Sequence, residues 1–235
     1  MKNTLLTLML LHFGLISFCQ GTGYGIKEYD RSIKKELISE VKEICDINPN
    51  FPAAWIKEYI SVEVSVTCDG EILKAQGVNQ NFTEEQQRII KMGETGSDIV
   101  VVVKYYPDNN LTKEVKEIDF AYTIVPDIYA VYQGGEEVMQ QYFKKNAVDR
   151  IFEVTNKDVH KVIVSFDITE NGDVINSTVS QRSHSSDVDE IVLSAVKNMS
   201  KWIPARNADG TNVSQSREFI ITREMCSNPT LYVYE

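Results

Sequence analysis

The sequence lacks the residue patterns that most enzymes need. It contains no Gly-x-Ser-x-Gly, no His-Glu-x-x-His and no P-loop. His160 and His184 stand apart from any cysteine or acidic partner at metal-ligand spacing. Asp187 and Asp189 are close together, but they lie at a predicted helix start, where acidic groups offset the helix dipole. We therefore expect no catalytic activity, no metal and no cofactor.

Long apolar runs are also absent after residue 18. The run at residues 5–18 is short for a bilayer span and is typical of a signal peptide. Ser17 and Cys19 occupy the −3 and −1 positions of a cleavage site, so we expect residues 1–19 to be removed and Gln20 to begin an exported, periplasmic chain. A retained N-terminal anchor and acylation of the cysteine are the alternatives.

Basic residues, proline and cysteine are all scarce. Lysine and arginine number 24 against 34 acidic residues, and the resulting net charge of −10 repels phosphate backbones, so nucleic acid is not an expected partner. The six prolines form no cluster, so there is no stiff proline-rich linker. Cys45, Cys68 and Cys226 lie beyond the signal. Either Cys45 and Cys68 form a disulfide in an oxidising compartment, or all three are half-buried thiols.

What the sequence does contain is a repeat. Residues 60–75 and 162–177 align without a gap, with apolar residues at alternate positions and with Gly70 and Gly172 offset by 102. Period-two alternation predicts a half-buried strand. Asp69-Gly70 and Asn171-Gly172 then predict two-residue hairpin turns, because both turn residues need a positive φ. Each half therefore contains the same predicted hairpin.

The same further elements flank both hairpins. A helix precedes each one, a second helix follows it, and an extended segment, a turn and a last strand end the unit. The predicted segments are helices at 31–45, 83–92, 135–147 and 186–199, extended segments at 98–106 and 202–206, and last strands at 115–125 and 215–223. We expect an α+β fold of two tandem units, each a three-stranded antiparallel sheet with two helices on one face. The predicted domains are residues 24–126 and 127–226, followed by a tail at 227–235.

A set of motifs in the second half resembles one known family. Tyr132-Gln-Gly-Gly135, the Asn171-Gly172 hairpin, a helix ending at Met199, Trp202-Ile-Pro204-Ala205 and Asp209-Gly210 follow one another in a characteristic order. Over residues 129–225 the chain resembles the TonB C-terminal domain. The first half resembles a more distant copy, since it lacks the Trp-x-Pro-Ala element.

The resemblance implies a periplasmic domain that captures a short segment of an outer-membrane transporter, which adds as a strand beside the last strand. Carried onto this chain, the partner-binding residues are Gln215, Arg217, Phe219, Ile221 and Arg223, with support from Phe51 and Pro52 of the first half. We therefore expect a non-catalytic envelope module that binds a partner protein.

Two alternatives stay open at this point. Uncovered sheet edges are a liability, so the other domain or a second copy in a homodimer is an equal candidate to cover the last strand. The other alternative function is an energy transducer serving outer-membrane transport, which requires a retained anchor and a long linker. The short apolar segment and the scattered prolines argue against it.

Overall fold

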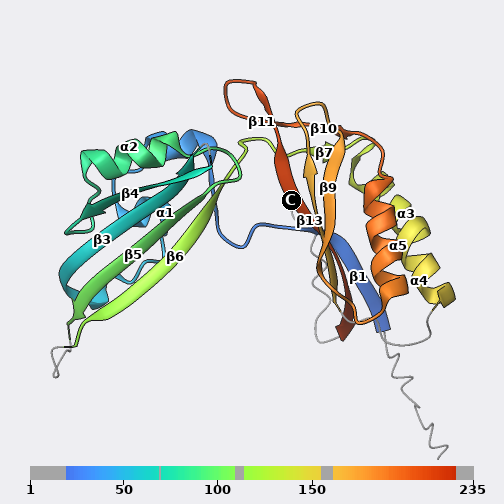
Figure 1. Cartoon of the computed structure of the whole chain (residues 1–235), viewed down its shortest axis with the longest axis horizontal. Coiled ribbons are helices and arrows are strands. Elements are labelled where there is room, and N and C mark those ends of the chain that lie inside the picture. Colours follow the sequence, from blue (N-terminus) through green and yellow to red (C-terminus); the bar gives the residue numbers. More distant parts are fainter. Residues whose placement is uncertain (1–19, 69, 109–113, 155–160, 226–235) are drawn as a thin grey trace, which may run out of the picture.

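The computed structural model describes residues 20–68, 70–108, 114–154 and 161–225. Within them the chain is α+β and has two hydrophobic cores, each under its own main sheet (Figure 1). The predicted signal peptide, the C-terminal tail, Cys226, Asp69 and most of the turn after Pro107 lie outside these residues. We refer to residues 32–125 as the N-terminal unit, and to residues 20–27 together with 131–225 as the C-terminal unit.

The N-terminal unit has a five-stranded sheet in the order β2-β6-β5-β3-β4, antiparallel except for the β2–β6 pair. Its strands are β2 (Ser32–Lys34), β3 (Ile56–Cys68), β4 (Glu71–Gly77), β5 (Asp98–Pro107) and β6 (Lys116–Val125). Its helical segments are the 3₁₀ turns Lys35–Ser39 and Ala53–Trp55, and the helices α1 (Ile44–Ile47) and α2 (Glu84–Met92).

The C-terminal unit has a four-stranded antiparallel sheet in the order β1-β13-β8-β9, with helices on one face (Figure 1). Its strands are β1 (Gln20–Lys27), β8 (Val162–Ile168), β9 (Val174–Gln181) and β13 (Gln215–Met225). Its helices are α3 (Gly135–Phe143), a π-helical turn (Lys144–Val148), α4 (Asp149–Val154) and α5 (Ser186–Lys197). Two short ribbons pair β7 (Val131–Tyr132) with β10 (Trp202–Ile203), and β11 (Ala205–Arg206) with β12 (Asn212–Val213).

Both predicted hairpins are present, but the second turn differs from its prediction. β3 pairs with β4 and β8 pairs with β9, and Gly70 and Gly172 have φ of +77° and +81°. Asn171, however, has no positive φ, so the two-residue turn with both residues in that region is wrong. The Thr169 hydroxyl instead accepts from the backbone N–H groups of Asn171 and Asp173, and the Gly172 N–H donates to the Thr169 carbonyl at 2.8 Å. The loop is therefore longer and only Gly172 is left-handed.

Three of the four predicted helices form. α2 begins with the predicted capping box, in which the Gln86 N–H donates to the Thr83 hydroxyl. The predicted helix at 31–45 is wrong, because two local interactions compete with it. Ser32–Lys34 pairs with β6, which buries Ile33, and the Asp46 carboxylate accepts from the N–H groups of Lys42 and Glu43, which starts a new turn at α1.

The strand that follows the second helix is also placed differently from the prediction in the first half. β5 pairs with β3 in the same way as β13 pairs with β8, so β5 and not β6 is the counterpart of β13. Alternate residues of β5 are completely buried, as expected for a central strand. Each sheet therefore has one more antiparallel strand than the three predicted. The strand on the far side of β5 is β6, and the strand on the far side of β13 is β1.

Of the two alternatives for Cys45 and Cys68, the structure does not form the disulfide. Cys45 is a free thiol, whose pKa is raised by burial and by the carboxylates of Glu43 and Asp46. It lies near Tyr59, whose pKa is raised by burial and by the Cys45 thiol. Cys68 lies nine residues beyond Tyr59 on β3, which is about 30 Å at the usual rise per residue. This distance is far beyond the reach of a disulfide from Cys45.

Candidate functional site

The predicted binding strand, β13, is not an open edge in this structure. It pairs with β8 on one side and with β1 on the other, and the β1–β13 register runs over eight residue pairs from Gln20–Met225 to Lys27–Glu218 (Figure 1). The covering strand is neither the N-terminal unit nor a second copy. It is a segment that precedes the N-terminal unit in the chain.

β1 lies on the sheet like a bound extended peptide. Tyr24 pairs with Ile221 and Ile26 pairs with Phe219, and both β1 side chains pack partly buried against the C-terminal core. The Tyr24 hydroxyl donates to the Gln140 carbonyl of α3 at 3.4 Å. Because successive side chains of a strand point to opposite faces, Gly23 and Gly25 lie on the other face. Backbone pairing and two apolar side chains thus hold this strand.

Two of the predicted partner-binding side chains belong to the core. Phe219 and Ile221 are completely buried, and the Phe219 ring stacks on Phe143 of α3 with centroids 3.6 Å apart. A strand beside β13 contacts these residues through backbone and through its own side chains above them. Arg223 pairs with Thr22 through the backbone, and its side chain lies outside the described part of the chain.

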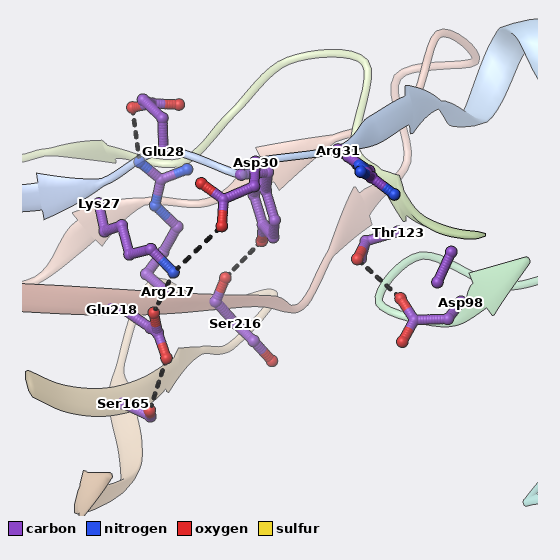
Figure 2. A pocket seen from close by; sticks show the side chains of 12 residues that line it. Lys27, Glu28, Asp30, Arg31, Asp98, Thr123, Ser165, Ser216, Arg217 and Glu218 are labelled. Atoms are coloured by element: carbon purple, nitrogen blue, oxygen red, sulfur yellow. Dashed lines mark hydrogen bonds and ion pairs between the residues drawn. The ribbon is translucent and has the colours of Figure 1, made fainter. Parts of the chain in front are cut away.

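Arg217 is a buried arginine held by both chain connections between the units. Its side chain is only 7% exposed, and its guanidinium carbon lies 5.6 Å from the Tyr29 ring centroid and 5.3 Å from that of Tyr129. Its Nη2 pairs with the Glu28 carboxylate at 3.1 Å (Figure 2). Nε and Nη1 have no hydrogen-bond partner, so the two aromatic faces are what compensates their desolvation.

Gln215 and Ser216 add two further contacts to the same connections. The Gln215 side-chain oxygen accepts from the Ala130 N–H at 2.8 Å, and the Tyr29 hydroxyl donates to the Ser216 carbonyl. Burial is the main reason why the pKa of Tyr29 is raised. The connections at residues 28–31 and 126–130 therefore both fasten to the start of β13. We call Gln215, Arg217, Glu28, Tyr29 and Tyr129 the Arg217 cluster.

An open hollow of about 690 Å³ lies beside this cluster, between the two units (Figure 2). Lys27 pairs there with Glu218 at 3.1 Å and with Asp30 at 3.7 Å, which raises the pKa of Lys27, mainly through the hydrogen bond to Glu218. On the opposite wall the Thr123 hydroxyl bonds to the Asp98 carboxylate at 2.7 Å. The described residues contain no group of three His, Cys, Asp or Glu side chains placed to hold a metal ion.

The structure does not bring Phe51 and Pro52 to β13. Phe51 is buried in the N-terminal core, where its ring lies 5.9 Å from that of Phe120. Pro52 is half-buried at the start of the following 3₁₀ turn. The expected support from these two residues is therefore wrong, because they help to fill the other unit's core.

Sequence reasoning missed the residues that cover β13. Tyr24 and Ile26 stand at alternate positions with glycines between them, which is a weak strand signal that was available. Nothing in the sequence indicates that Tyr29 and Tyr129, a hundred residues apart, meet on one arginine.

Two elements of the quoted motif set contact each other. The Trp202 N–H donates to the Gly172 carbonyl at 2.8 Å, and a Cβ on residue 172 would overlap the Trp202 backbone. The Trp202 ring is buried and packs edge-on against Tyr132 at 5.5 Å. Trp202 is therefore a core residue of the C-terminal unit.

Comparison with curated proteins and with solved structures gave no match. Within the described residues, no helix has the length and apolarity needed to cross a bilayer. Residues 158–222 match the family model of the Gram-negative bacterial TonB protein C-terminal. The matched segment includes β8, β9, α5 and most of β13, and over these elements the chain is similar to the TonB C-terminal family.

Proposed function

We propose that the C-terminal unit is a non-catalytic, envelope protein-interaction module that binds an extended segment of a partner protein by strand addition along β13. The resemblance to the TonB C-terminal domain supports this mode of binding, in which backbone hydrogen bonds supply affinity and alternate side chains supply selectivity. The proposed contacts are the backbone of residues 218–225 and the side chains of Phe219 and Ile221, which lie next to those of the added strand on the core face of the sheet.

The observation that carries this proposal is the seat of β1. A strand from the far end of the chain lies antiparallel on β13 over eight residue pairs, with no hairpin joining the two. The edge of β13 therefore accepts an added strand, and a partner segment would lie where β1 now lies. An outer-membrane transporter or another envelope protein in an exported setting is the proposed source of that segment.

We propose further that the N-terminal unit is a divergent copy that serves as a scaffold. Its hairpin, second helix and following strand occur in the same order as β8, β9, α5 and β13. The position beside its β5 is filled by β6, which is buried at Phe120 and Ile124. The N-terminal unit therefore has no equivalent place for an added strand.

Site-specific photo-crosslinking in whole cells tests the partner-binding proposal. A photoreactive residue at Thr222, on the face of β13 away from the core, is expected to trap a specific envelope protein. The matched control is the same residue at Lys104, an exposed position on β5. Strand addition at β13 would be contradicted if Thr222 gave no crosslinked product, or if Thr222 and Lys104 gave the same product in equal amounts.

A test for export and anchoring accompanies it. N-terminal sequencing of the protein purified from the envelope is expected to begin at Gln20. A chain that still contains residues 1–19 would favour the energy-transducer alternative.

A further inference from the structure

We infer that β1 is an intramolecular ligand that closes the β13 edge, and that the partner segment has the chemistry of β1. The partner would be an extended stretch with two apolar residues at alternate positions, one small residue between them, and a basic residue directly after the second apolar one. This inference rests on the proposed function of β13.

The side chains of β1 define the apolar part of that pattern. Tyr24 and Ile26 lie over Ile221 and Phe219 and join the edge of the C-terminal core. The intervening Gly25 has open space where a side chain would begin, so its face tolerates small residues. A segment with aromatic and aliphatic side chains two residues apart would bury the same surface.

The charge at the end of β1 defines the basic part. Lys27 stands opposite Glu218, with the ammonium nitrogen 3.1 Å from the carboxylate, and the other Glu218 oxygen accepts from the Ser165 hydroxyl at 3.3 Å. When β1 leaves, Glu218 loses its cation. An incoming strand with Lys or Arg at this position restores the pair, and one with Asp or Glu meets repulsion.

β1 is held less firmly than its counterpart in the N-terminal unit. β6 follows β5 directly in the chain and carries the buried side chains Phe120, Ile124 and Val125. The two apolar anchors of β1 are only partly buried, and the N-terminal unit separates β1 from β13 in sequence. The apolar area that a strand buries supplies most of the free energy that binds it to the sheet. β1 buries less than β6, so β1 is the more exchangeable of the two.

The Arg217 cluster keeps β1 in place from its C-terminal end. Glu28 and Tyr29 follow β1 immediately and bind Arg217 and the Ser216 carbonyl. Because Tyr129, on the other connection, stacks on the same guanidinium, the seat of β1 is tied to the path of both connections.

The test uses the full mature chain and a fluorescent peptide with the sequence of residues 20–28. Ile26→Asp puts a carboxylate against the core and should release β1. By fluorescence anisotropy the variant is expected to bind the peptide at least about tenfold more tightly than the wild-type chain, because apparent affinity scales with the fraction of open edge. Gly25→Ser, on the other face, is the matched control and should behave as wild type.

The outcomes separate clearly. A folded Ile26→Asp chain that ignores the peptide, or a wild-type chain that binds it equally well, overturns the inference, and so does a wild-type dimer in which β1 exchanges between copies. A peptide carrying Ile26→Asp should not bind. If Ile26→Asp fails to fold, Ile26→Ala is tested in the same assay. Peptide binding without any crosslink from Thr222 would contradict the proposed function and leave the intramolecular ligand supported. A crosslink from Thr222 without peptide binding would support the proposed function and contradict the intramolecular ligand.

Discussion

The two sheets fill the same edge position by different means. In the N-terminal unit the strand beside β5 is β6, which directly follows β5 in the chain. In the C-terminal unit the strand beside β13 is β1, which precedes the whole N-terminal unit in the chain. A hairpin strand has a high local concentration, whereas β1 must return across a whole domain. In the proposed function, this difference separates a scaffold sheet from one in which the covering strand exchanges with a partner segment.

A second difference lies in the central strands themselves. Counted from the hairpin glycines, Val64 corresponds to Phe166, so their partners Val101 and Arg217 occupy the same place in the two sheets. Likewise Ile99 corresponds to Gln215. The C-terminal sheet thus has two buried polar residues where the N-terminal sheet has aliphatic ones, and both polar residues bind the connections between the units.

Truncating a buried ring in each unit should give the largest effects. Phe219→Ala removes the ring that stacks on Phe143, and Phe120→Ala removes the ring beside Phe51. Each is expected to cost about 3–5 kcal/mol of unfolding free energy. Since the cores are separate clusters, each variant should lower mainly its own unit's transition in thermal unfolding followed by residue-resolved hydrogen exchange. Equal destabilisation of both units by either variant would contradict the separation.

The two hairpin glycines should respond unequally to alanine. Gly70→Ala meets open space and should cost only about 1–2 kcal/mol, for its positive φ. Gly172→Ala bears the same strain and also overlaps the Trp202 backbone, so a total of roughly 2–5 kcal/mol is expected. Urea unfolding of both variants measures the difference. Equal losses would show that the Gly172–Trp202 contact is not rigid.

These glycines also mark how far the sequence predicts the fold. The alternation before Gly70 and Gly172 and the Thr83 capping box were sufficient for both hairpins and for α2, because these signals are local. For β1 the sequence holds only a weak strand signal, and its pairing with β13 was not predictable. Its glycines weaken the strand signal, and its partner Phe219 is nearly two hundred residues away, where only tertiary pairing decides.

Of the predicted site, residues 215–223 do form a strand, but the surroundings of its side chains were predicted incompletely. Phe219 and Ile221 were placed on β13, but their burial depends on helix α3. Arg217 appears in the sequence as an ordinary strand-edge cation. That two tyrosines from separate connections enclose it depends on the path of both connections, and no periodicity encodes that path.

Replacing Arg217 by the residue of its counterpart sharpens the comparison. Arg217→Val should change overall stability by less than about 2 kcal/mol, because the Glu28 carboxylate that it leaves unpaired is 39% exposed and can be hydrated. It removes the anchor of Glu28 and Tyr29, so faster hydrogen exchange is expected in β1 and not in β6. Arg217→Lys keeps the charge but loses planar stacking, so its hydrogen-exchange rate in β1 should fall between those of the wild type and Arg217→Val. Unchanged exchange in β1 would refute a holding role for the cluster.

The smallest effect concerns matched ion pairs at the two edges. Lys27–Glu218 joins β1 to β13 at 3.1 Å with both side chains 36% exposed, and Lys104–Glu117 joins β5 to β6 at 3.5 Å with about half of each exposed. Lys27→Met should cost about 0.2–1 kcal/mol after allowance for solvent screening, and Lys104→Met less. Double-mutant cycles with Glu218→Gln and Glu117→Gln, measured at low and high salt, give both coupling energies.

The raised pKa of Lys27 adds a pH signature to the same pair. A raised folded-state pKa means that the contribution is fully present below the ordinary lysine value and is lost as pH rises through the folded value. Hydrogen exchange in β1, corrected for intrinsic rates, should therefore accelerate in alkaline solution relative to β6, and Lys27→Met should abolish that difference. An alkaline loosening that persists in Lys27→Met would assign it to another group, of which Tyr29, also with a raised pKa, is the nearest to test by Tyr29→Phe.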